Sequence, residues 1–220
     1  VEGTANGEIE LEGDAASLTK VKMIGARMSH GRIVIHGDVG MHLGTGMSGG
    51  EIIVEGNAGD WAGAEMSGGL LEIKGDAGDA LAANYRGTDI GMLGGEIFVH
   101  GSAGSEVGGA MRRGFIAVGG DSGDFTGVNM LAGSIIVLGN LGWRTAAGMI
   151  RGVVVSMHDA RILPTFTYAT TYKPSFLRLY LLRMREMGLP VEDAYLNGLY
   201  RRYSGDSVEL NRGEILIFDS

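Results

Sequence analysis

His30, His36 and His42 follow one another at an even spacing of six residues. Imidazole nitrogens commonly bind Zn²⁺, so three histidines on one face could form a metal site. The chain repeats every 19 residues, and this repeat instead places the three side chains on different sides of a coil. We interpret them as solvent-facing structural residues and expect no metal site in this chain.

Two glycine-rich motifs overlap near residue 46. Gly44–Gly49 fits the GxGxxG pattern of dinucleotide sites, and Gly46–Gly50 fits the GxSxG pattern of hydrolase nucleophiles. The first motif needs a strand before it and a helix after it, and the second needs a strand-to-helix turn. Here the following residues begin another repeat, so we expect no catalytic or cofactor-binding residues from either motif.

A row of short polar side chains recurs once per repeat. It consists of Asp14, Asp38, Asn57, Asp76, Ser102, Asp121, Asn140 and Asp159. Corner aspartates bind calcium in some repeat proteins, but their motif recurs every nine residues. We interpret this row as side chains that accept hydrogen bonds from turn amides.

Seven of the twelve methionines share one register: Met28, Met47, Met66, Met92, Met111, Met130 and Met149. Thioethers can select copper(I), but flexible methionine side chains also fill irregular corners of a core. We predict that these residues form a structural ladder inside the protein.

All these residues belong to an internal repeat of 19 residues. Its anchor glycines are Gly31, Gly50, Gly69, Gly95, Gly114, Gly133 and Gly152. The single interval of 26 contains a seven-residue insertion near Asn84 to Ile90, and a longer unit begins at Gly7. The chain therefore contains eight units, the last of them truncated.

Each unit predicts a short strand bounded by glycine corners. Apolar residues stand two and four positions past the anchor, as in Ile52 and Val54, and glycines follow at positions six and nine. Alternation of this kind is typical of a strand with one buried face, and glycine suits sharp corners. The fold class predicted for residues 1–158 is an all-β, right-handed, single-stranded parallel β-helix with coils of about 19 residues.

The outward face of these strands predicts an interaction surface. Three positions past each anchor stand Val34, Ile53, Glu72, Phe98, Ala117, Ile136 and Val155. A continuous apolar row needs a cover, supplied either by the C-terminal helices or by another subunit. The candidate interface with partner proteins comprises Val34, Ile53, Phe98, Ile136 and Val155, with Tyr180, Arg183 and Tyr200 from the C-terminal region.

Residues 159–220 form a second region, with four of the 40 glycines and six of the seven tyrosines. Ser175 can cap a helix that ends near Met187, and a second helix is predicted over Glu192–Tyr203. Glu214–Phe218 is predicted to be a strand. We expect this helical extension to cover the open end of the β-helix or to reach a neighbour.

Composition limits the class of protein. The 18 basic and 26 acidic residues give a net charge of −8, which disfavours nucleic-acid binding. The chain has no cysteine for disulfides or thiolate metal sites and no apolar run of about 18 residues. We expect a soluble, cytoplasmic protein.

The run Gly50–Gly59, GEIIVEGNAG, resembles the GXGXG repeat family. That family includes the C-terminal domain of the glutamate synthase large subunit and the C subunit of formylmethanofuran dehydrogenase. The C-terminal segments Pro174–Tyr180, Gly188–Pro190, Tyr203–Asp206 and Arg212–Leu216 resemble the bacterial branch, the C subunit of formyltransferase/hydrolase complexes.

The resemblance implies a role without catalysis for this chain. It implies partner subunits that carry the chemistry: an amidohydrolase-like A subunit with zinc, a B subunit and a formyltransferase D subunit. It also implies a methanofuran-like carrier in those partners, for a reaction that moves a formyl group from tetrahydromethanopterin and releases formate. No catalytic, cofactor or metal residue of the family can be matched here.

Two other functions stay open from sequence. The chain could serve as a glutamate synthase-type β-helix subunit or as the C subunit of a molybdenum or tungsten formylmethanofuran dehydrogenase. A rod that binds carbohydrate or calcium is a further alternative, which a calcium-dependent melting temperature would reveal.

Overall fold

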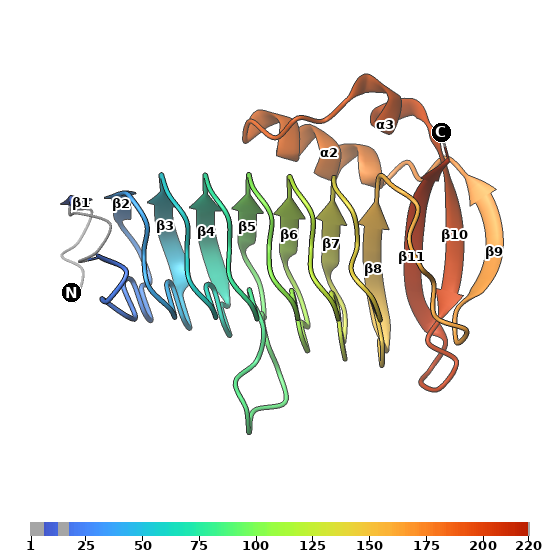
Figure 1. Ribbon diagram of the computed structural model, residues 1–220, viewed down its shortest axis with the longest axis horizontal. Coiled ribbons are helices and arrows are strands. Elements are labelled where there is room, and N and C mark those ends of the chain that lie inside the picture. Colours follow the sequence, from blue (N-terminus) through green and yellow to red (C-terminus); the bar gives the residue numbers. More distant parts are fainter. Residues whose placement is uncertain (1–6, 13–17, 220) are drawn as a thin grey trace.

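A computed structural model describes residues 7–12 and 18–219 of the chain. It is mostly β, with one 11-stranded sheet and two helices in the described part (Figure 1). The strands are β1 (Glu8–Glu12), β2 (Arg32–His36), β3 (Ser48–Val54), β4 (Gly68–Ile73), β5 (Glu96–Val99), β6 (Phe115–Val118), β7 (Ser134–Val137), β8 (Arg151–Ser156), β9 (Thr167–Tyr172), β10 (Leu199–Gly205) and β11 (Arg212–Asp219), and the helices are α2 (Leu177–Glu186) and α3 (Asp193–Asn197). The prediction of a mostly β fold is confirmed.

Strands β1 to β8 form an elongated stack (Figure 1). Each strand pairs in parallel with the next, and the register places equivalent repeat positions opposite one another, as for Ile33, Ile52 and Leu71. A second line of one-residue parallel bridges runs along another side of the stack. It joins Val39, Ala58, Ala77, Ala103, Ser122 and Leu141. The architecture is that of a β-helix-like rod.

The interior of the rod is built from the inward strand residues and the methionine row. Met47, Met66, Met92, Met111, Met130 and Met149 are completely buried in one core with the inward Ile, Leu and Val side chains. Met28 is partly buried against the same core. Because a methionine is buried at the same position of successive coils, neighbouring coils stack through the same kind of contact.

The polar row connects neighbouring coils. The Oδ1 atoms of Asp38, Asn57 and Asp76 each accept a hydrogen bond of 2.7 Å from a backbone N–H of the next coil. Asp121 does the same at 2.6 Å. The interpretation as partners of turn amides is confirmed for these residues, whereas Asp14 lies outside the described residues.

The extension differs from the sequence prediction. β11 continues the sheet in parallel beside β8, and β10 pairs antiparallel with both β11 and β9. The helix predicted over Glu192–Tyr203 is wrong beyond residue 197, because Leu199–Gly205 is strand β10. The extension is therefore mixed α and β instead of helical. The first helix is present as α2, without the predicted side-chain cap.

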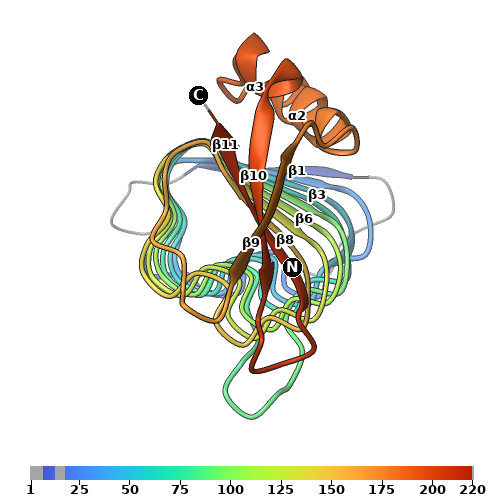
Figure 2. The same ribbon diagram turned by 90° about the vertical axis from the view of Figure 1, so that its right-hand side faces the viewer.

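Strands, not helices, cover the C-terminal end of the rod. Figure 2 shows β9, β10 and β11 crossing that end, with α2 and α3 displaced to one side. Phe166, Ile215 and Ile217 are buried in the same core as the methionine row. Residue 158 lies in the segment that connects β8 to β9, and the strands on both sides of it belong to one sheet. None of the described helices is long and apolar enough to cross a membrane.

Candidate functional site

The outward apolar row has two different environments. Over β5 to β8, Phe98, Ile136 and Val155 are fully buried, in a cluster with Leu181 and Met184 of α2. Figure 1 shows α2 lying across these strands. The sequence named these three residues as candidate interface residues and left open whether the C-terminal helices or another subunit cover the row. The chain's own helix α2 covers them.

The predicted interface residues of the extension also make internal contacts. Tyr200 is buried and donates a hydrogen bond of 2.8 Å to the Tyr195 carbonyl oxygen. The ring of Tyr180 lies 4.8 Å from that of Phe115. Tyr200 is therefore a core residue, and half-buried Tyr180 helps to attach α2 to the sheet.

Arg183 fastens the same helix to the edge of the covered region. Its Nε and Nη2 atoms donate to Glu96 Oε2 at 3.1 and 2.8 Å, and its guanidinium lies 5.5 Å from the Phe98 ring centroid. The hydrogen bonds from Arg183 to Glu96 and Glu186 raise the pKa of this guanidinium. Its role within the chain is to position α2.

The N-terminal half of the row is not covered by α2. Ile53 is half-buried there, whereas Val34 is buried, with 9% of its surface exposed. The row is interrupted by Glu72, a buried carboxylate whose Oε1 pairs with His100 Nε2 at 2.9 Å and with Lys74. This charge marks the boundary between the covered and uncovered halves.

Sequence reasoning missed an exposed apolar stripe on the outer side of α2. Leu179 is 72% exposed, Leu182 40% and Phe176 38%. The signal in the sequence was their spacing of three residues, next to the stripe that is buried. A helix that is apolar on two sides either packs between two surfaces or leaves one apolar side exposed.

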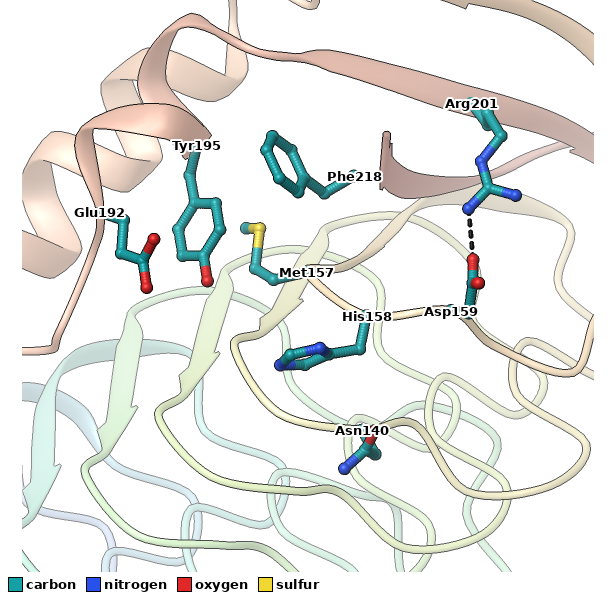
Figure 3. A pocket seen from close by; sticks show the side chains of 8 residues that line it. All are labelled: Asn140, Met157, His158, Asp159, Glu192, Tyr195, Arg201 and Phe218. Atoms are coloured by element: carbon teal, nitrogen blue, oxygen red, sulfur yellow. Dashed lines mark hydrogen bonds and ion pairs between the residues drawn. The ribbon is translucent and has the colours of Figure 1, made fainter. Parts of the chain in front are cut away.

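A pocket of about 580 Å³ lies between the last coil and the extension (Figure 3). Its apolar part is formed by Met157, Tyr195 and Phe218. Its polar part is formed by Asn140, His158, Asp159, Glu192 and Arg201. Asp159 pairs with Arg201, whose Nε also lies 3.2 Å from Asp219 Oδ1. The pocket exists because residues 157–159 leave the rod where α3 and β10 return to it.

The pocket offers acids, a guanidinium and an imidazole, but its eight lining residues include no serine, threonine or cysteine. Burial raises the pKa of the Tyr195 phenol, and the Glu192 carboxylate raises it further. This phenol therefore stays protonated at neutral pH. Within the described ranges, no group of three or more His, Cys, Asp or Glu side chains could hold a metal ion. The charged and hydrogen-bonding groups beside an apolar wall are suited to binding a molecule with a polar group.

The evenly spaced histidines occupy separate surroundings. His36 Nδ1 lies 2.7 Å from Glu55 Oε2, and His42 Nδ1 lies 2.8 Å from the Tyr85 hydroxyl. His30 Nδ1 lies 2.9 Å from its neighbour Ser29 Oγ. Each ring thus has its own partner.

Comparison with models of protein families found no match, and comparison with curated proteins found none either. Among solved structures, the chain is similar to one in the X-ray crystal structure of the formyltransferase/hydrolase complex (FhcABCD) from Methylorubrum extorquens in complex with methylofuran. The two chains are 36% identical with a TM-score of 0.87, and the match covers 97% of this chain and 78% of the other. The chain therefore belongs to the same family as the matched chain of that complex. The resemblance inferred from sequence is confirmed at the level of this complex, which is an assembly of several protein subunits.

Proposed function

We propose that this chain is the C subunit of a formyltransferase/hydrolase complex and acts as its scaffold without an active site of its own. The observation that carries the proposal is the match to a chain of such a complex, at 36% identity over 97% of this chain. A rod held by repeated coil-to-coil contacts is suited to keep other proteins at fixed positions. The finer fold description, a right-handed GXGXG β-helix with 19-residue coils, belongs to the same proposal.

The proposed complex transfers a formyl group from tetrahydromethanopterin to a methanofuran-like carrier and hydrolyses it to formate. The methylofuran named with the similar complex supports this class of carrier. Zinc and the carrier would be held by the partner subunits, an amidohydrolase-like A, a B and a formyltransferase D. We place the complex in the cytoplasm.

The uncovered half of the outward row is the part of the predicted interface that we retain. Val34 and Ile53 lie on strands β2 and β3, beyond the reach of α2, and continue the apolar row that this helix covers over β5 to β8. We propose that a partner protein of the complex contacts Ile53, which is half-buried, whereas Val34 is already buried within the chain.

The experiment is affinity purification of the tagged chain from its native cell, followed by mass spectrometry and assay of the isolated complex. We expect the A, B and D subunits in the purified material, and loss of assembled complex on deletion of this chain. Recovery of glutamate synthase subunits, of molybdenum or tungsten dehydrogenase subunits, or of the chain alone would refute the proposal.

A second measurement addresses the absence of an active site. His158→Ala and Tyr195→Phe remove the imidazole and the phenol of the pocket, the groups best suited to proton transfer. The complex assembled with either variant should keep its formyltransferase and hydrolase rates. A rate reduced by about 100-fold, with assembly intact, would indicate catalysis by this chain.

A further inference from the structure

Four arginines stand at the edge of the sheet from which its parallel strands start. Arg112 and Arg113 directly precede the anchor of β6, Arg151 begins β8, and Arg212 begins β11; all four are exposed. Arg212 is the register partner of Arg151. Parallel strands lie about 4.8 Å apart, so Arg113, two strands before β8, is about 10 Å from Arg151. We call these four residues the arginine edge.

The arginine edge is electrostatically unfavourable for the chain by itself. Like charges directly opposite one another on neighbouring strands repel. Arg32, Arg183 and Arg201 each pair with acidic side chains. By contrast, none of the four side chains of the arginine edge makes a hydrogen bond, ion pair or ring contact with a described residue. The four exposed guanidinium groups are therefore free to pair with acidic groups of another molecule, in a chain whose own net charge is −8.

Two loops project on either side of this edge (Figures 1 and 2). One is the insertion at residues 84–90, which carries the exposed Arg86. It is fixed to the rod by the Tyr85 hydroxyl, 2.8 Å from His42 Nδ1, and by a hydrogen bond of 2.6 Å from Thr88 to Glu65. Insertions on one side of a repeat protein often mark its binding face.

The other loop is the turn between β10 and β11. Asp206 is buried there, and its carboxylate accepts hydrogen bonds of 3.0 Å from the Gly148 and Val208 N–H groups. Val208 and Leu210 are 76% and 58% exposed. The turn also carries the exposed Glu209, between these two apolar residues. It therefore presents apolar side chains in a fixed position next to the unpaired guanidinium group of Arg212.

We propose that the arginine edge binds an acidic segment of another subunit of the complex, whose apolar residues contact Val208 and Leu210. Guanidinium groups bind carboxylates through paired hydrogen bonds, and a carboxylate between Arg151 and Arg212 removes their mutual repulsion. The inference rests on the proposed function, because it assumes a multi-subunit complex. The proposed surface lies on the opposite side of the molecule from α2 (Figure 1). The proposed partner is an acidic segment.

The test uses the complex purified through the tagged full-length chain. Arg151→Glu places an acid opposite Arg212, so the isolated chain should melt at the same or a slightly higher temperature, while binding of the partner weakens about tenfold. Added salt should weaken binding of the wild-type chain more than binding of this variant, because screening acts on the charge attraction. Substitution of a residue with a purely structural role would instead lower the melting temperature and the binding together.

Arg178→Glu is the matched control, because Arg178 is exposed on α2 and its hydrogen bond goes to the Asn197 amide oxygen. It should leave binding unchanged. Equal effects of Arg151→Glu and Arg178→Glu, or none from either, would overturn the inference. If the wild-type chain recovers no subunits, the proposed function fails instead.

A photo-crosslinking residue at position 113 identifies what occupies the edge. We expect a crosslink to a peptide of another subunit that is rich in Asp and Glu. A crosslink to a second copy of this chain or to a basic peptide would overturn the proposal. So would a variant complex that keeps every subunit and loses a small bound anion.

Discussion

The rod and the extension are stabilised in different ways. In the rod, each buried contact repeats in the next coil, from the methionine row to the hydrogen bonds accepted by Asp38, Asn57 and Asp76. In the extension, each contact occurs once, such as the Arg183 to Glu96 pair and the buried Tyr200 hydroxyl. The rod buries its inward row by itself, whereas the extension covers the outward row where it packs against β5 to β8.

The clearest test of this comparison uses two isoleucines at one repeat position. Ile136 is fully buried beneath the extension, whereas Ile53 is half-buried. Ile136→Ala should cost about 2–5 kcal/mol of unfolding free energy, and Ile53→Ala less than half of that, because a buried cavity adds to the lost transfer energy. Denaturant unfolding measures both. Equal losses would mean that α2 does not cover the strip in solution.

A second pair of variants concerns the crowding between coils. Gly69 and Gly87 both have positive φ, at +89° and +95°. A Cβ at Gly69 would lie 2.6 Å from Met47 Cε and 2.8 Å from the Gly50 oxygen, whereas at Gly87 it would meet nothing within 4 Å. Both alanine variants incur the backbone cost of about 1–2 kcal/mol, and only Gly69→Ala adds about 1–3 kcal/mol of overpacking. Similar losses in thermal unfolding would contradict tight stacking of the coils.

Tyr200→Phe examines the extension at high pH. Loss of the hydrogen bond to the Tyr195 carbonyl should cost about 1 kcal/mol at neutral pH. Burial also raises the pKa of the Tyr200 phenol, so the unfolded chain ionises first, near its ordinary value of 10.0. This stability is therefore complete below pH 10 and is lost as the pH rises above it. The variant should lose less stability than the wild type in that range. Parallel curves would show that the phenol is accessible to water.

The smallest effect is expected at the rod surface. The hydrogen bond to Glu55 raises the pKa of His36 above its ordinary value of 6.5. A raised pKa means that this contribution to stability is complete below pH 6.5 and is lost as the pH rises through the folded-state pKa. Glu55→Gln should lower the His36 pKa, measured by NMR titration. An unchanged pKa would show that the pair does not form in solution.

The rod was predictable in detail because its signals are local and repeated. The spacing of the glycines and of residues such as Ile52 and Val54 located the strands, and the structure pairs Ile52 with its equivalents Ile33 and Leu71. A single unit would be weak evidence for a strand, but eight units with the same pattern predict the same strand position. The insertion at residues 84–90 was visible for the same reason, as a break in the period.

The extension was predictable only in part. α2 and the last strand were expected, but Leu196, Leu199, Tyr200 and Tyr203 suggested a helix where β10 lies. Strand β10 depends on partners distant in sequence, since Tyr200 pairs with Tyr172 and Phe218, and its register opposes Leu199 to Asp219. Strand formation follows such neighbours more than local preference, so a helical period in one segment was insufficient.

The sequence by itself determined the period, the inward row and the polar row, because neighbouring coils repeat one set of short-range contacts. Only the tertiary structure decided which outward residues are covered, that strands cover the end of the rod, and that Arg151 and Arg212 lie side by side. Those outcomes depend on where a non-repeating segment returns to the rod. The physical reason is that the extension buries the apolar surface against which it packs. The repeat pattern of the rod contains no information on where the extension packs.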